Sequence, residues 1–142
     1  MILAACGAAS LRPAITPFPQ AQVDTVFTAP DSAIIRLNYL LLTEGLVLHV
    51  ISPVEGFVET EWFDAETLAT GDANSLDTKD LVRLRFWADA VQEGQTVVVG
   101  EATNRISVDP SLPIRQKEAV VPPEHPAHAI LTRILDALRS SF

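Results

Sequence analysis

The stretch LVRLRFWA at residues 81–88 decides the fold, because apolar and charged side chains alternate along it. A period of two predicts a β-strand with two unlike faces. One face carries Val82, Leu84 and Phe86, and the other carries Arg83, Arg85 and Trp87. Such alternation is typical of an antiparallel sheet that buries one face and leaves the other in water.

Segments on both sides of this strand extend the sheet. Branched and alternating residues predict four further strands, at residues 23–28, 46–52, 57–63 and 95–105. Pro53 and Gly56 mark a turn between two of them, and Gly94 marks another. The short connections favour antiparallel hairpins.

Two segments have the period of a helix. The first begins at Asp31 or Ser32 and ends at Gly45, which favours a helix C-terminus. Its apolar face consists of Ala33, Ile34, Leu37, Leu40 and Leu41. Its other side is also partly apolar, through Ile35, Tyr39 and Leu42. We therefore expect this helix to contact a second helix as well as the sheet.

The second helix begins at His125 or Pro126 and closes the chain. Its apolar stripe consists of Ala127, Ile130, Leu131, Ile134 and Leu138. The resulting order is β-α-β-β-β-β-α. It predicts an α+β fold in which an antiparallel sheet of four to five strands packs on two helices, in a helix-grip-like arrangement. We expect one such domain over residues 23–142.

The N-terminal residues resemble a bacterial lipobox, the site at which a lipoprotein precursor is acylated and cleaved. Leu3, Ala4 and Ala5 precede Cys6, which is the only cysteine, and Gly7 follows it. We therefore expect lipid attachment at Cys6. Only five residues precede Cys6, whereas a signal peptide carries a basic region and an apolar region of about 7 to 15 residues. Two interpretations stay open: translation starts upstream of Met1, or the match is accidental and the protein is cytosolic.

Residues 7–22 contain three prolines among small and polar residues, which disfavours regular structure. We interpret residues 1–22 as a lipobox remnant and a proline-rich tether. Ile15 and Phe18 interrupt it with apolar side chains that can dock on the domain or on a partner.

Composition excludes several classes of function. The net charge of −8 argues against a nucleic-acid partner, because phosphate binding depends on Lys and Arg. One cysteine allows no disulfide within the chain. No uncharged apolar run approaches the roughly 20 residues that span a bilayer. We expect a chain that is anchored to a membrane and does not cross it.

The predicted hairpins place a candidate partner surface on the outer face of the sheet. If residues 57–63 pair with residues 81–88, Glu59 and Glu61 lie opposite Arg83 and Arg85. The same register places Phe57 beside Trp87, and the next strand adds Val97 and Val99. An exposed apolar cluster of this kind usually marks a contact surface. The alternative is that residues 64–80 or 109–123 fold over it.

Catalytic and metal-binding patterns are weak in this sequence. Glu124, His125 and His128 are the only local group of metal-ligand types, and a zinc site needs further ligands that we do not find. No nucleophile elbow or glycine-rich phosphate loop occurs, and His49 has no obvious acid partner. We therefore expect no enzyme activity, no metal and no cofactor.

The segment from Gly45 to Trp62 resembles a known family. A helix runs into GLVLHV at residues 45–50, and GFVETEW follows at residues 56–62. This arrangement resembles the repeated domain of BamC-like lipoproteins, accessory members of the outer-membrane β-barrel assembly machine. The resemblance covers about residues 23–63 and implies a small helix-grip lipoprotein without enzymatic activity. The family has two such domains and a long N-terminal segment, so a role in barrel assembly does not follow.

These observations predict a non-catalytic accessory subunit, lipid-anchored on the periplasmic side of a bacterial membrane. Its partner would be a larger membrane complex for assembly, respiration or photosynthesis. A tether to the membrane would raise its local concentration near such a complex. The alternative is a periplasmic carrier that holds a small apolar ligand between the sheet and the C-terminal helix.

Overall fold

A computed structural model describes residues 9–71 and 81–142. Cys6, the expected lipid attachment site, lies outside the described residues. The elements in chain order are β1 (Gln22–Val26), α1 (Pro30–Thr43), β2 (Leu48–Ser52), β3 (Phe57–Thr60), β4 (Phe63–Asp64), β5 (Leu81–Gln92), β6 (Gln95–Arg105), the 3-10 helix η1 (Ile114–Gln116), β7 (Glu118–Val120) and α2 (Pro126–Arg139).

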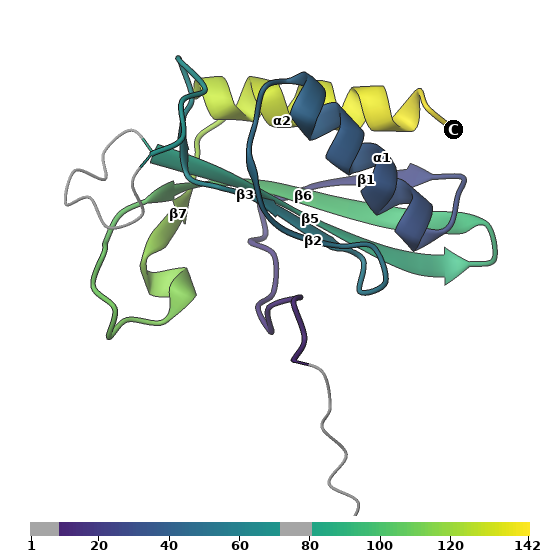
Figure 1. The fold of residues 1–142 in the computed structure, drawn as a ribbon, viewed down its shortest axis with the longest axis horizontal. Helices are drawn as coiled ribbons and strands as arrows, with labels where there is room; N and C mark the ends of the chain where they lie inside the picture. The colour runs from purple at the N-terminus through teal and green to yellow at the C-terminus, as the bar shows by residue number, and fades with distance from the viewer. Residues whose placement is uncertain (1–8, 72–80) are drawn as a thin grey trace, which may run out of the picture.

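The strands form one antiparallel sheet, with seven strands among the described residues. Its main order is β1-β6-β5-β3-β2, while β4 also pairs with β5 and β7 with β6. Both helices lie on the same side of the sheet (Figure 1). We call the opposite side the open face. The predicted α+β fold, an antiparallel sheet with two helices, is confirmed.

The core lies between the helices and the sheet. The apolar face of α1, including Ile34 and Leu37, is fully buried there, as is the stripe of α2 around Ile134. The sheet contributes Val58, Val82, Leu84, Phe86 and Val98 to the same cluster. The apolar face of residues 81–88, with Val82, Leu84 and Phe86, therefore faces the core, as the period of two predicts.

The helix boundaries follow proline and glycine chemistry. Helix α1 begins one to two residues earlier than expected, with Ala29 at its N-cap and Pro30 in its first turn. Proline suits that position because its fixed φ is helical and its missing N–H has no partner there. Gly45 ends the helix with a φ of +88°, as expected of a glycine after the last turn.

The outer side of α1 differs from the expectation. Ile35, Tyr39 and Leu42 do not pack on the second helix, since each is more than half exposed. Helix α1 does contact α2, as expected, and polar contacts join them near their ends. Arg36 donates from Nε to Ser141 Oγ, and Glu44 pairs with Arg133 at 2.7 Å. Ile35, Tyr39 and Leu42 thus form a largely exposed apolar flank of α1, on which the Arg36 guanidinium lies 4.8 Å from the Tyr39 ring.

One predicted strand is divided in two, and one strand arises where the sequence predicted none. The predicted strand 57–63 is divided into β3 and β4, because the backbone is irregular at Glu61 and Trp62. The proline-rich stretch 109–123, expected to be merely extended, contains η1 and β7. Within the described chain, neither helix is long and apolar enough to cross a membrane.

Candidate functional site

The open face carries the strongest concentration of charge in the described structure. The predicted register is confirmed at two positions, where Phe57 pairs with Trp87 and Glu59 with Arg85. Glu61 follows the end of β3 and does not pair with Arg83 as expected. Strand β6 extends the same rows, because Val99 lies opposite Trp87 and Glu101 opposite Arg85. The structure shows the covered face, the alternative to an exposed cluster, since the central residues are buried. Residues 10–18 lie over it, besides part of residues 109–123.

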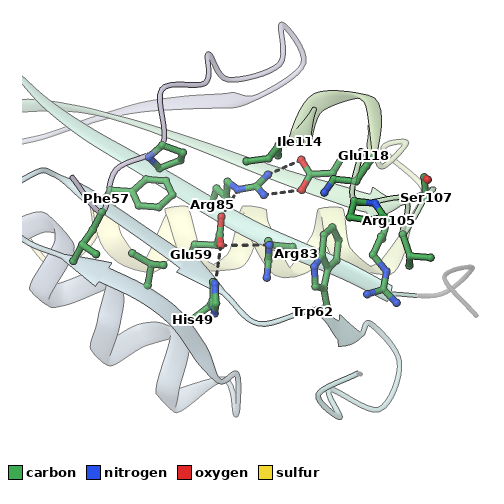
Figure 2. A pocket seen from close by; sticks show the side chains of 16 residues that line it. His49, Phe57, Glu59, Trp62, Arg83, Arg85, Arg105, Ser107, Ile114 and Glu118 are labelled. Carbon is green, nitrogen blue, oxygen red and sulfur yellow. Dashed lines mark hydrogen bonds and ion pairs between the residues drawn. The ribbon is translucent and has the colours of Figure 1, made fainter. Parts of the chain in front are cut away.

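Arg85 is the centre of a buried ion cluster, with a relative exposure of 1%. Its two terminal nitrogens donate to both carboxylate oxygens of Glu118, at 2.6 and 2.7 Å. Its Nε donates to Glu59 (Figure 2). Its Nη1 lies 3.4 Å from Glu101 Oε1. Burial by itself lowers the pKa of Arg85, but the hydrogen bonds and charges of Glu118 and Glu59 outweigh it and raise that pKa above its ordinary value.

Two further arginines share these carboxylates. Arg115 donates from Nη1 to Glu101 at 2.7 Å and lies 3.3 Å from Glu118. Arg83 lies 3.3 Å from Glu59. Buried carboxylates are costly unless they are paired. The shared arginines therefore make it possible for three glutamates to lie under 10% exposed on one face.

An N-terminal strap, residues 10–18, covers the apolar part of the open face. At its start Arg12 binds Asp89 at 2.8 Å and the Glu55 carbonyl oxygen at 2.9 Å. At its end the Phe18 N–H donates to Glu101 at 3.0 Å. On the open face, the pair of Trp87 and Val99 lies between Asp89 and Glu101. The strap is bonded to both Asp89 and Glu101, so it must cross this pair.

The strap explains why the predicted partner surface is not exposed. Phe57 and Trp87 have relative exposures of 0% and 2%, so neither is available to a partner while the strap is docked. Val97 and Val99 are half-buried. Ile15 and Phe18 are half-buried as well, and the Phe18 ring lies 4.1 Å below the Arg115 guanidinium. The segment interpreted as a tether is thus packed on the domain.

A pocket of about 420 Å³ opens beside the strap on the open face. Arg83, Arg85, Glu59 and Glu118 line it from the sheet, and Trp62 stands on one side of it (Figure 2). The complete lining is Leu11, Pro13, His49, Val50, Phe57, Glu59, Trp62, Arg83, Arg85, Arg105, Ser107, Val108, Pro110, Ile114, Lys117 and Glu118. It therefore joins the strap, the sheet and the segment before β7.

Trp62 is a residue of the candidate site that a strict period of two misplaces. Alternation from Val58 would put it on the face of Val58, but the irregular backbone after Thr60 turns it to the open face. Its ring lies 4.5 Å from the Arg83 guanidinium and 5.6 Å from that of Arg105. Both distances fall within the range of cation–π attraction.

Other cluster members were missed altogether. Glu101 could have been found by continuing the β5–β6 hairpin register two residues beyond Val99. Glu118 and Arg115 belong to a stretch without periodicity, so no sequence signal placed them. His49 does have an acid partner, contrary to expectation: its Nδ1 lies 3.0 Å from Glu61 Oε1, across the β2–β3 hairpin.

The histidines of the C-terminal helix have structural contacts. His125 caps α2 by accepting from the Ala127 N–H at 3.0 Å, and His128 lies 3.2 Å from the Gln22 amide nitrogen. In the part of the chain that the structure describes, no three His, Cys, Asp or Glu side chains are grouped as metal ligands.

Comparison with known proteins does not assign the chain to a family. No family model matches the sequence, and no curated protein matches it. The resemblance to BamC-like lipoproteins therefore stays a prediction. The geometry of the open face and of the exposed helix surface is what bears on function.

Proposed function

We propose that this chain is a non-catalytic accessory domain, lipid-anchored on the periplasmic side of a bacterial membrane, that docks on a larger membrane protein complex. The observation that carries the proposal is the docked strap. A lipoprotein tether is usually a spacer, whereas this one is bonded to the domain from Ser10 onward.

The strap sets how far a lipid on Cys6 could lie from the domain. Ser10 Oγ and the Leu11 N–H both donate to the Glu55 carboxylate. Cys6 is four residues before Ser10, and four residues span at most about 14 Å. Acylation at Cys6 would therefore hold the domain close to the bilayer, with its open face toward the lipid.

The charged groups of the open face support a role without catalysis. General acid–base catalysis needs a group that is free to exchange a proton with a substrate. Here Glu59, Glu101 and Glu118 are each engaged by one or more arginines. Carboxylates that are held in this way by arginines suit a structural cluster better than contact with a substrate.

The surface that would meet the partner is the flank of α1 together with the edge of the sheet. β2 ends the main strand order, so one side of it has no strand partner among the described residues. The apolar side chains that surround this edge are Ile35, Tyr39, Leu42, Val47 and Ile51. An extended apolar segment of a membrane subunit could pair with β2 and cover this stripe.

This proposal is tested on the chain purified from its native membrane. Intact mass should show an acyl modification on Cys6, and the modification should be absent from Cys6→Ser. A photo-reactive residue at Tyr39 should crosslink to an integral membrane subunit, and one at Ala129 on α2 should not. The Leu42→Asp variant should lose the Tyr39 crosslink. An unmodified Cys6 in a soluble protein would refute the proposal.

A second pocket favours the carrier function as an alternative. It measures about 280 Å³ and lies between β6 and α2, where Ala102 and Leu131 line it with Val120 and Val121. A small apolar molecule could occupy this space between the sheet and the C-terminal helix. Native mass spectrometry separates the two functions, since a carrier should retain a small molecule and an accessory domain should retain membrane subunits.

A further inference from the structure

The open-face pocket has the size and the composition of a small-molecule site. Its volume of about 420 Å³ lies within the range of about 300 to 1,000 Å³ that is common for such sites. Charged groups form its floor, and apolar side chains from the strap and from the segment before β7 form its walls, among them Pro13, Val108 and Ile114. A ligand with one charged end and one apolar end matches this division.

The charges of the floor favour an anion. Arg83, Arg85 and Lys117 line the pocket against two carboxylates, Glu59 and Glu118. Positive charge is therefore in excess even when Arg105 is left aside. This excess is local, because the chain as a whole carries a net charge of −8.

Among the described residues, Arg83 shares its one ion-pair partner, Glu59, with Arg85. The two terminal nitrogens of Arg85 hold both oxygens of Glu118, which Arg115 also contacts at 3.3 Å. Burial lowers the pKa of Arg83, and the charge of Arg85 lowers it further, against the opposing effect of Glu59. An anion placed beside Arg83 would relieve this cost.

Trp62 adds a flat apolar wall next to Arg83. The ring is 7% exposed and lines the pocket, and Arg83 stacks on it at 4.5 Å. This contact fixes the direction of the guanidinium. Its Nε donates to the Thr60 carbonyl oxygen at 2.9 Å, and Nη1 lies 3.3 Å from Glu59. The other terminal N–H groups of this ordered arginine can then face an oxyanion.

We propose that the open-face pocket binds a small organic anion, with its carboxylate or phosphate on Arg83 and Lys117 and its apolar body against Trp62 and Ile114. A free amphiphilic acid and the headgroup of an anionic phospholipid share this chemistry. The site lies on the face opposite α1 and α2 and is independent of the anchor at Cys6.

The experiment is an NMR titration of the unlipidated full chain, followed through its two indole N–H signals. Trp62 lines the pocket, whereas Trp87 lies under the strap, so the Trp62 signal reports on the ligand and the Trp87 signal on docking of the strap. The probes are sodium octanoate, inorganic phosphate, and vesicles of phosphatidylglycerol mixed with phosphatidylcholine. Octanoate should shift the Trp62 signal saturably, with a Kd on the order of millimolar or tighter.

Matched variants test the role of each cation. Arg83→Met should weaken binding about tenfold, since it removes a charge-assisted contact. Lys117→Met should weaken it by about threefold, because the ammonium of the half-buried Lys117 is a single point charge on a flexible chain. Arg139→Met makes the same change of charge on α2 and should have no effect. A Trp87 signal at the same position as in the unaltered protein shows that a variant is folded. If Arg83→Met does not fold, Lys117→Met takes its place as the test of the site.

The outcomes separate the sources of the anion. Octanoate binding supports a free acid, and binding to vesicles alone, lost in Arg83→Met, supports a lipid headgroup. Phosphate binding as tight as that of octanoate would overturn the role of the apolar wall. No saturable shift with octanoate or vesicles, or equal binding by both folded variants, would overturn the site.

Discussion

Replacing Arg85 by methionine tests whether the ion cluster holds the open face together. Methionine keeps most of the length of the side chain but removes the charge and all the donors. Glu118 would lose its two short hydrogen bonds and keep only the 3.3 Å contact with Arg115. Glu59 would keep Arg83, and Glu101 would keep Arg115. Of the three glutamates, Glu118 is therefore the most affected.

The expected loss follows from how deeply the pair is buried. Arg85 and Glu118 have relative exposures of 1% and 5%. Removing one partner of a buried pair costs about 3 to 5 kcal/mol, because the other charge stays buried and uncompensated. For a domain of this size, each kcal/mol corresponds to roughly 3 to 5 °C in Tm, so we expect a decrease of about 10 to 20 °C.

Urea denaturation followed by tryptophan fluorescence measures this loss. Arg139→Met is the matched control, since Arg139 is largely exposed and its pairs with Asp24 and Asp136 contribute at most about 1 kcal/mol. The Arg85→Met, Glu118→Met double variant should recover part of the stability, because no unpaired charge then remains at that position. A loss below about 1 kcal/mol in Arg85→Met, with an unchanged dependence on urea, would show that water screens the cluster.

Two further predictions concern the strap and the turns. Hydrogen bonds from Ser10 and Ser52 hold the pKa of Glu55 below its ordinary value of 4.5. This attachment of the strap is therefore complete above pH 4.5, and it is lost as the pH falls through the lowered pKa of Glu55 in the folded protein. The Leu11 amide, which donates to Glu55 at 2.9 Å, should report the step by NMR, and Glu55→Gln should abolish it. Gly56 has a φ of +67°, and a Cβ there would lie 2.1 Å from the Ala88 carbonyl oxygen, so Gly56→Ala should destabilise the domain by more than about 2 kcal/mol. Gly94→Ala has a similar φ of +72° in open space and should cost only about 1 kcal/mol in thermal denaturation; equal losses would refute the argument from the close contact.

The strand register was predictable because local patterns determine it. Alternation assigned the faces of β5, and the short turns at Pro53 to Gly56 and at Gly94 left little freedom in the pairing. Glu59 therefore lies opposite Arg85 as expected. The backbone departs from the regular pleat at Glu61 and Trp62. One extra residue there reverses the alternation, so the same reasoning puts the Trp62 side chain on the wrong face.

The burial of the open face was not predictable from local patterns. Arginine and glutamate are almost never fully buried unless they are paired. The sequence therefore predicts that a face that carries them is exposed to water. What buries it here are contacts between distant residues, such as Arg12 with Asp89 and Arg115 with the Thr16 carbonyl. Both arginines stand in stretches that are rich in proline and have no period. Local sequence therefore carries no signal of where these segments dock.

The strap and the pocket share the same residues, which links their behaviour. Leu11 and Pro13 line the pocket, and Glu101, which accepts the Phe18 N–H, is also a partner of Arg85 on the pocket floor. A ligand that contacts the docked strap must favour docking, and docking must raise the affinity for that ligand by the same factor. Acid that protonates Glu55 and frees the start of the strap should therefore weaken binding in the pocket, although no ligand contact to Glu55 is required.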